Sequence, residues 1–328
     1  MLNILFMGTP DFAKESLKCL YEEKYNIIGV VTNPDKPKGR GMKMVASEVK
    51  EYAVAQNLTV YQPEKVRKNT EFIEKIKSLN PDLIVVVAYG KILPKEILEI
   101  PKYGCINVHA SLLPKYRGAA PIQWSVINGD KITGVTTMYM DEGMDTGDII
   151  LKEEVEIGEN ETTGELWDRL STIGGKLLIK TVKQIEEGTA PREKQPEDFT
   201  MAPMLDKEMA RINWEEKTAK EIHNLVRGLN PIMGAYTFLN EKKIKFWKVR
   251  TRTEEELVEL FPELEEYLFK LKDVTEGTIL FANDKKGLFV KAKEGIIEII
   301  EIQGENAKKM PVGDFLRGNS LMAGEIFE

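Results

Sequence analysis

The sequence of 328 residues has few side chains that bind metals or form disulfides, with two histidines and two cysteines. Cys19 and Cys105 lack metal-ligand spacing, and we expect both to be reduced core residues of a cytoplasmic protein without a bound metal. No apolar run reaches the ~18 residues that a membrane helix needs. The first residues lack the basic region and cleavage site of a secretory signal, and we expect them to form a strand. These absences predict a cytoplasmic protein with no membrane partner.

The chain is acidic overall, with 53 acidic and 46 basic residues and a formal net charge of −7, so it is not a uniformly basic nucleic-acid binder. Acids gather in residues 253–273, which contain eight acidic and two basic residues. The remainder of residues 207–328 contains 18 basic and 14 acidic residues. A local basic face is one interpretation of this part, and a scattered surface of mixed charge is the other.

The first part of the chain alternates strand and helix patterns. An apolar run at residues 2–7 is followed by a helical pattern at 12–23 and a strand pattern at 27–32, which predicts a parallel βαβ unit. Residues 83–88 are apolar on both faces, as in a central strand of a parallel sheet. The turn after residue 7 lacks the Gly-x-Gly-x-x-Gly fingerprint, so we expect no nicotinamide cofactor. We predict an α/β fold with a doubly wound, Rossmann-like parallel sheet.

A group of polar side chains begins in the next predicted strand, residues 105–109. Asn107 and His109 are two residues apart and therefore point to the same face of that strand. Asp145 follows 36 residues after His109, in a loop bracketed by glycines. An amide can stabilise an oxygen that gains negative charge, an imidazole can move a proton near neutral pH, and a carboxylate can orient the imidazole. The three side chains are candidate catalytic residues.

This group contains no nucleophile, which favours direct acyl or formyl transfer through a tetrahedral intermediate over a covalent acyl-enzyme. Ser111 is near in sequence, but Leu112 and Leu113 follow it, which predicts a pocket wall. In the alternative interpretation, Asn107 and His109 are ordinary polar residues with satisfied hydrogen bonds at a strand end. The scarcity of histidine favours the catalytic interpretation.

Residues 33–43 are basic and rich in proline and glycine, which predicts an exposed loop. Lys36, Lys38, Arg40 and Lys43 are its candidates for contacts with nucleic-acid phosphates, and Arg40 lies between two glycines. A solvated connection without a binding role explains the composition equally well.

The composition of the chain changes at a polar stretch that contains three prolines. We predict a first domain at residues 1–189, a linker at 190–206 and a second domain at 207–328. Several short strand patterns with turns between them predict a small β-barrel in the second domain, and an OB-like barrel is the preferred form.

One strand pattern of the second domain is basic. Lys245 and Lys248 are interleaved there with Phe246 and Trp247, a combination that suits nucleic acid. Lysines that keep an edge strand from aggregating explain the same pattern equally well. We interpret His223, the second histidine, as a packing or capping residue rather than a catalytic one.

Several motifs together resemble the methionyl-tRNA formyltransferase family. They are Phe-Met-Gly-Thr-Pro-Asp-Phe-Ala from residue 6, Gly-Arg-Gly from 39, Asn-Val-His-Ala-Ser-Leu-Leu-Pro from 107, Met-Asp-Thr-Gly-Asp from 144, Val-Arg-Gly-Leu-Asn-Pro from 226 and Phe-Leu-Arg-Gly from 315. The resemblance covers nearly the whole chain. The motif from residue 107 is typical of folate-dependent formyltransferases in general. The Gly-Arg-Gly loop and the second domain narrow the resemblance to the family that acts on initiator tRNA.

The resemblance implies that 10-formyltetrahydrofolate donates a formyl group to the α-amine of methionyl-initiator tRNA, for translation initiation. It makes Asn107, His109 and Asp145 the catalytic set. It implies that folate contacts Ser111, Leu112, Leu113, Pro114, Ala88, Tyr89 and Gly90. We expect contacts with tRNA at Arg40, Lys36, Lys38, Lys43, Lys245 and Lys248, and we expect the chain to be a monomer.

Two other functions stay open at this point. A formyltransferase or formyl-folate hydrolase with a small amine or water as acceptor would share the first domain, but it would not need the basic loop. A non-catalytic RNA-binding protein on a degenerate α/β scaffold is the alternative from another class, and the complete set of Asn107, His109 and Asp145 argues against it.

The acidic residues 253–273 depart from the family pattern. Met42, Met44 and Met138 are available to line a methionine pocket, but nothing in the sequence locates them there, and Met138 suits the filling of a core better.

Overall fold

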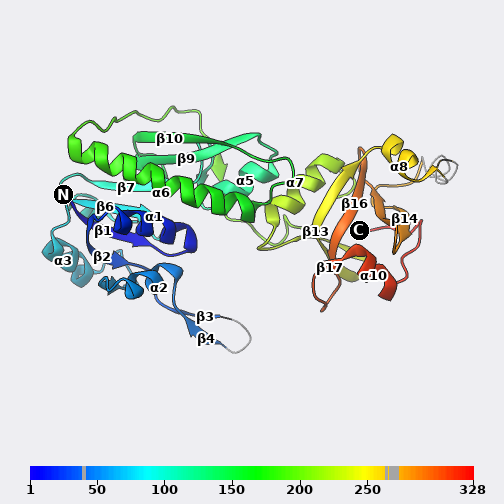
Figure 1. Cartoon of the computed structure of the whole chain (residues 1–328), viewed down its shortest axis with the longest axis horizontal. Coiled ribbons are helices and arrows are strands. Elements are labelled where there is room, and N and C mark those ends of the chain that lie inside the picture. Colours follow the sequence, from blue (N-terminus) through cyan, green and yellow to red (C-terminus); the bar gives the residue numbers. More distant parts are fainter. Residues whose placement is uncertain (39–41, 263–264, 266–272) are drawn as a thin grey trace. The chain divides into compact units, whose positions relative to one another are not determined.

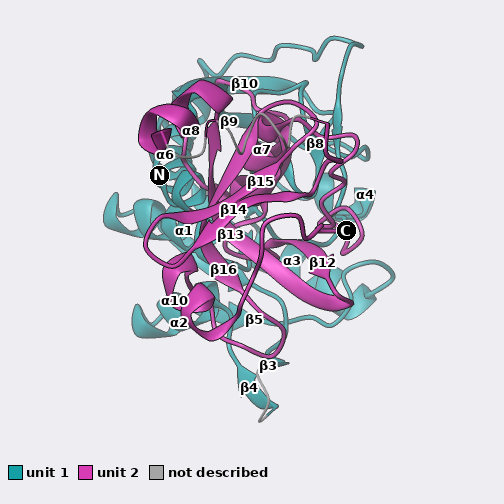
Figure 2. Cartoon of the chain, turned by 90° about the vertical axis from the view of Figure 1, so that its right-hand side faces the viewer, with its two compact units in different colours: residues 1–122, 132–157, 165–204 teal, residues 123–131, 158–164, 205–328 magenta. Residues whose placement is uncertain are grey.

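The computed structural model describes residues 1–38, 42–262, 265 and 273–328. The chain forms two compact units. Unit 1 contains residues 1–122, 132–157 and 165–204, and unit 2 contains residues 123–131, 158–164 and 205–328 (Figure 2). Arg40 and residues 266–272 of the acidic segment lie outside the described residues.

Unit 1 is built on a seven-stranded sheet with the order β10-β9-β7-β6-β1-β2-β5 (Figure 1). Its strands are β1 (Asn3–Gly8), β2 (Asn26–Val31), β5 (Val60–Tyr61), β6 (Leu83–Val87), β7 (Cys105–His109), β9 (Ile132–Tyr139) and β10 (Ile149–Glu156). The strands from β5 to β7 in this order pair in parallel, whereas β9 is antiparallel to both β7 and β10. The Rossmann-like parallel sheet is confirmed, and it carries an antiparallel edge that local sequence patterns do not reveal.

The helices of this part of the chain are α1 (Asp11–Glu22), α2 (Glu48–Ala55), α3 (Thr70–Leu79), α4 (Lys95–Leu98), α5 (Pro121–Ile127) and α6 (Thr163–Glu187). The longest, α6, buries the apolar stripe that its sequence shows, including Leu166 and Leu170. A Cβ on Gly174 would lie 3.2 Å from Val108 and 3.5 Å from Val135, so α6 packs closely on β7 and β9. Among the described residues, no helix combines the length and apolar character that crossing a membrane requires.

Unit 2 contains an antiparallel sheet with the order β12-β13-β16-β15-β14, and β17 pairs with β16. Its strands are β12 (Ala235–Leu239), β13 (Lys242–Arg252), β14 (Ile279–Asn283), β15 (Gly287–Lys291), β16 (Ile296–Gln303) and β17 (Met310–Pro311). Its helices are α7 (Ala219–Leu229), α8 (Glu254–Leu260) and α10 (Val312–Gly318). The antiparallel strands agree with the sequence patterns, and the OB-like closure of the sheet stays a prediction.

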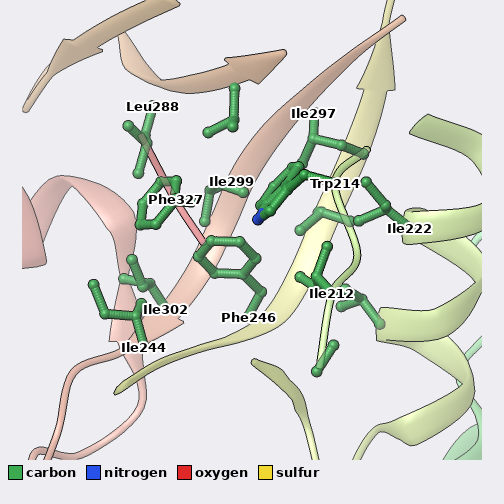
Figure 3. Close-up of a cluster of buried hydrophobic side chains, with 14 of the residues drawn as sticks. Ile212, Trp214, Ile222, Ile244, Phe246, Leu288, Ile297, Ile299, Ile302 and Phe327 are labelled. Atoms are coloured by element: carbon green, nitrogen blue, oxygen red, sulfur yellow. The ribbon is translucent and has the colours of Figure 1, made fainter. Parts of the chain in front are cut away.

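Three aromatic rings form the centre of the unit 2 core (Figure 3). Trp214 stacks on Phe327 with ring centroids 6.1 Å apart, and Phe246 meets Phe327 edge to face at 5.6 Å. The buried indole nitrogen of Trp214 donates to Thr237 Oγ1 at 2.9 Å, which satisfies its single polar group. Alternating residues of β13 and β16 enclose these rings, because one face of each strand is apolar.

A buried polar cluster surrounds His223 on α7. Its Nε2 lies 3.1 Å from Asn160 Oδ1, and the imidazole is 4% exposed. Arg227, one turn further along α7, donates to Asn224 Oδ1 and to the carbonyl groups of residues 158 and 161. Burial, with the nearby charge of Arg227 second, lowers the pKa of His223 from 6.5 to about 4.

This shift predicts a loss of stability in acid. The unfolded chain protonates His223 near pH 6.5, but the folded chain keeps it neutral down to about pH 4. The unfolded state therefore binds more protons across this window, and the unfolding free energy should fall by about 3 kcal/mol as the pH falls through it. Urea denaturation of the wild type and of His223→Gln at several pH values measures this. An identical pH dependence in both proteins would contradict the assignment.

Candidate active site

Two polar side chains lie where the central strands of unit 1 end. In the parallel pairing of β6 with β7, Val86 is opposite Asn107. On its other side β7 pairs with β9, with Thr136 opposite His109. Asn107 is half-buried and His109 is 6% exposed. Their two-residue spacing places both on one face of the sheet, as the sequence predicts.

The carboxylate of Asp145 meets both side chains. Its Oδ1 accepts a hydrogen bond from Asn107 Nδ2 at 3.5 Å, and its Oδ2 lies 3.7 Å from His109 Nδ1. A shorter bond, 2.8 Å, comes to Oδ2 from the backbone N–H of Gly118. Asp145 has a left-handed backbone with φ 55°, a conformation that aspartate tolerates better than most residues. The structure thus brings an amide, an imidazole and a carboxylate together.

The orientation of His109 is fixed from its other nitrogen. Nε2 lies 2.8 Å from the carbonyl oxygen of Tyr116. A carbonyl can only accept, so Nε2 carries a hydrogen and donates it. The Nδ1 atom is then directed toward Asp145, at a distance beyond a normal hydrogen bond. Tyr116 is itself held, because its N–H donates to Thr200 Oγ1 at 2.9 Å.

The residues predicted to contact folate after β7 differ in their exposure. The hydroxyl of Ser111 is fully buried and donates to the Lys115 carbonyl at 2.6 Å. Leu113 is buried in a small cluster with Met138. Leu112 and Pro114 are half-buried. Leu112 and Pro114 therefore offer surface to a ligand here, whereas Ser111 and Leu113 lie beneath that surface.

The second segment predicted to contact folate follows β6. Ala88 and Gly90 are exposed and have left-handed backbones, with φ 43° and 75°. Tyr89 between them is buried, and burial raises the pKa of its phenol to about 12. The Tyr89 carbonyl accepts from Asn33 Nδ2 at 2.9 Å. The turn presents the backbone of Ala88 and Gly90 outward, while the Tyr89 ring packs in the core.

The predicted basic residues lie in two places. Lys36 and Lys43 are exposed on an antiparallel hairpin of β3 (Lys36–Lys38) and β4 (Lys43–Val45), and Lys38 lies at the end of β3. Lys248 is exposed on β13. Lys245 is half-buried, and its Nζ donates to the Met233 carbonyl at 2.9 Å, so it is less available for a partner.

Profiles of known protein families match both parts of the chain. The formyl transferase profile matches residues 2–182, and the profile of the formyl transferase C-terminal domain matches residues 204–320. A curated methionyl-tRNA formyltransferase from Clostridioides difficile is 54% identical over 326 residues, or 99% of each chain. The chain belongs to the methionyl-tRNA formyltransferase family. A second curated member, from Acetivibrio thermocellus, is 48% identical over 99% of each chain. Membership in this family makes the chain an enzyme, a formyltransferase.

Two solved structures of low sequence identity share the fold of this chain. An N-formyltransferase from Helicobacter canadensis, solved with folinic acid and dTDP-3-aminofucose, has a TM-score of 0.64 and 20% identity over 94% of this chain and 100% of that chain. HypX from Aquifex aeolicus, solved with tetrahydrofolic acid, has a TM-score of 0.60 and 16% identity over 96% of this chain and 47% of that chain. At these identities the likeness concerns the fold alone.

In this family member, sequence reasoning missed a segment that borders the site. Residues 193–202 fall within the predicted linker, yet β11 (Met201–Ala202) pairs in parallel with β8 (Arg117–Gly118). Thr200 accepts the Tyr116 N–H, and Gln195 contacts the loop that carries Asp145. The polar, proline-containing sequence gave no sign of these contacts, because a two-residue strand leaves no periodic pattern.

The close approach of β8 and β11 predicts that Gly118→Ala destabilises the protein. A Cβ there would lie 2.7 Å from the Ala202 carbonyl oxygen, and Gly118 has φ 123°, which alanine disfavours. We expect a loss of about 1–3 kcal/mol in unfolding free energy, measured by urea denaturation. Gly318→Ala is the matched control, because the added Cβ would have no other described residue within 4 Å beyond its chain neighbours and its own helix backbone. Equal stability of the two variants would argue against this packing.

Proposed function

We propose that the chain transfers the formyl group of 10-formyltetrahydrofolate to the α-amine of methionine on initiator tRNA, in the cytoplasm and for translation initiation. The observation that carries the proposal is the convergence of Asn107 and His109 on Asp145. Full-length similarity to curated methionyl-tRNA formyltransferases supports the choice of acceptor. Residues 1–189 would act as the catalytic domain, residues 190–206 as the linker and residues 207–328 as an OB-like tRNA-binding domain in a monomer.

The reaction we propose is a direct attack. The neutral amine adds to the formyl carbon, the carbonyl oxygen becomes an oxyanion, and collapse of the tetrahedral intermediate breaks the bond to N10 of the folate. The amine loses a proton and the departing nitrogen gains one: either a water passes the proton between them, or protonated His109 gives its Nδ1 proton to that nitrogen and then takes up the proton of the amine. No covalent enzyme intermediate is needed, because the acceptor itself is the nucleophile.

The three side chains have separate roles in this scheme. An amide nitrogen has two hydrogens, and Asp145 occupies one of those on Asn107, which leaves the other to stabilise the oxyanion. Protonated His109 is the second donor, through Nδ1, because Nε2 is committed to the Tyr116 carbonyl. The Asp145 carboxylate, 3.7 Å from Nδ1, is placed to stabilise the imidazolium by Coulomb attraction.

The folate is proposed to lie against two segments. Backbone groups of Ala88, Tyr89 and Gly90 would hold the pterin, and the exposed left-handed turn at these residues supports this. Ser111, Leu112, Leu113 and Pro114 would form the second wall. No metal takes part in this proposal.

The tRNA is proposed to contact the β3–β4 hairpin and unit 2. Lys36, Lys38, Arg40 and Lys43 would meet phosphates of the acceptor end, and Lys245 and Lys248 would meet the RNA on β13. Aromatic rings paired with cations support the second contact: Lys243 Nζ lies 3.4 Å from the Tyr236 ring centroid, and Lys245 Nζ lies 5.6 Å from that of Trp247. Such pairs offer both a surface for bases and charge for phosphates.

Removal of either proposed oxyanion donor should slow the reaction. We expect Asn107→Ala and His109→Ala each to lower kcat about 10²- to 10³-fold, equivalent to ~3 kcal/mol, with little change in folate affinity. The assay follows formyl transfer to methionylated initiator tRNA, with elongator methionyl-tRNA and a small amine in parallel. Asn26→Ala, at the exposed start of β2, is the control. Unchanged turnover would remove the two residues from the mechanism, and transfer only to the small amine would favour a small-acceptor formyltransferase.

Arg40→Ala should weaken the use of tRNA without affecting folate. Arginine can make two parallel hydrogen bonds to phosphate, so we expect the KM for initiator tRNA to rise by about tenfold, at unchanged folate affinity. The control is Arg67→Ala, which removes an arginine that is exposed in unit 1. An equal effect of both variants would show a general charge effect instead of a specific contact.

A further inference from the structure

We propose that Gln195 is a positioning residue for formyl transfer, which acts by holding the loop that presents Asp145 to His109. This inference rests on the proposed function. Residues 191–200 are otherwise exposed, and Gln195 is the half-buried member of this run. Its burial indicates that this part of the predicted linker packs at a defined position in unit 1.

Gln195 uses its whole side-chain amide in contacts with two segments of the site. Nε2 donates to the carbonyl oxygens of Asp145 and Gly147, both at 2.8 Å. Oε1 accepts from Nε and Nη2 of Arg117, at 3.0 and 2.7 Å. A primary amide has two hydrogens and two acceptor lone pairs, which these four bonds can use in full, and Nε2 also lies 3.9 Å from Met138 Sδ. Among the other residue types, only asparagine carries a side chain with this combination, and it is one methylene shorter.

The loop with Asp145 needs such support because of the direction of β9. Its antiparallel pairing with β7 places Thr136 opposite His109 and Tyr139 opposite Ile106, so β9 ends beside the beginning of β7. The connection to β10 must fold back over the sheet to bring Asp145 to His109. This return requires the left-handed backbone of Asp145 and a close approach of Gly147 to the Tyr139 carbonyl oxygen.

Arg117 extends the support to the carboxylate itself. Its side chain is 7% exposed, and its guanidinium lies 4.5 Å from the Phe199 ring centroid. The next residue, Gly118, donates its N–H to Asp145 Oδ2. Through one amide, Gln195 therefore fixes the backbone of Asp145 and also the segment that binds its carboxylate. Without Gln195, both ends of this contact can move relative to His109.

Two variants separate the bonds of Gln195. Gln195→Met keeps the length of the side chain and removes all four hydrogen bonds. Gln195→Glu keeps an acceptor for Arg117 but places a carboxylate oxygen against the two carbonyl oxygens, so it provides a second test if the first variant does not fold. Gln184→Met in α6 is the matched control, because Gln184 is half-buried in the same unit and its Oε1 has no hydrogen-bond partner among the described residues.

The experiment combines steady-state kinetics with NMR of the imidazole ring signals. The chain has two histidines, so its spectrum contains one set of signals from His109 and one from His223, and the His223→Gln variant assigns them. His223 lies in unit 2 and is the internal control. We expect Gln195→Met to lower kcat about 10- to 100-fold, with a smaller change in KM for either substrate. We also expect it to shift the His109 signals and leave those of His223 unchanged.

Two results would overturn the proposal. One is a kcat for Gln195→Met within about twofold of the wild type, because misplacement of a catalytic group by ~1 Å costs far more. The other is a lower kcat with unmoved His109 signals, which would place the effect of Gln195 elsewhere. If the wild type itself transfers no formyl group to tRNA, the proposed function fails. The NMR signals do not depend on turnover and then still decide whether Gln195 orders the pair of Asp145 and His109.

Discussion

The site depends on one partly buried contact, between the Asp145 carboxylate and the backbone N–H of Gly118. The sheet alone fixes Asn107 and His109, because both lie on β7. It does not fix Asp145, which belongs to a connection between two other strands. A backbone donor at 2.8 Å has no side-chain freedom to lose, and it therefore sets the carboxylate position more firmly than the 3.5 Å bond from Asn107 does. The arrangement of amide, imidazole and carboxylate follows from this contact.

The sequence predicted the features that depend on residues close together in the chain. It missed the features that depend on residues far apart in the chain. The strands of unit 1 follow from short apolar runs, and the shared face of Asn107 and His109 follows from a spacing of two residues; both are local properties. The antiparallel direction of β9 depends on how the chain connects β7 to β9. Neither the composition nor the periodicity of residues 132–139 encodes that connection. Gln195 was missed for the same reason: its four hydrogen bonds join residues separated by about 50 to 80 positions, while its neighbours are polar and exposed.

The fold does not determine the acceptor. The Helicobacter canadensis N-formyltransferase was solved with a nucleotide-linked amino sugar, and it shares this architecture at 20% identity. The transfer step we propose needs only a neutral amine beside a formyl carbon, which many different acceptors can supply. Selection of the acceptor must therefore come from parts outside the sheet of unit 1. In the proposed function, the β3–β4 hairpin and the cation-aromatic pairs on β12 and β13 would be such parts, since lysines bind phosphates and aromatic rings stack on bases.

The chemistry of Ser111 and Cys105, a hydroxyl and a thiol on or just after β7, explains why an attack by the acceptor itself suits this site. Ser111 is fully buried, and its hydroxyl hydrogen is committed to the Lys115 carbonyl, so no base reaches it. Cys105, at the start of β7, is also buried, and burial raises the pKa of its thiol to about 12. A thiol with this pKa does not form a thiolate near neutral pH, and the thiolate is the reactive form. Neither group can carry a formyl group, whereas Asn107 and His109 are placed to stabilise the charge that a direct attack creates.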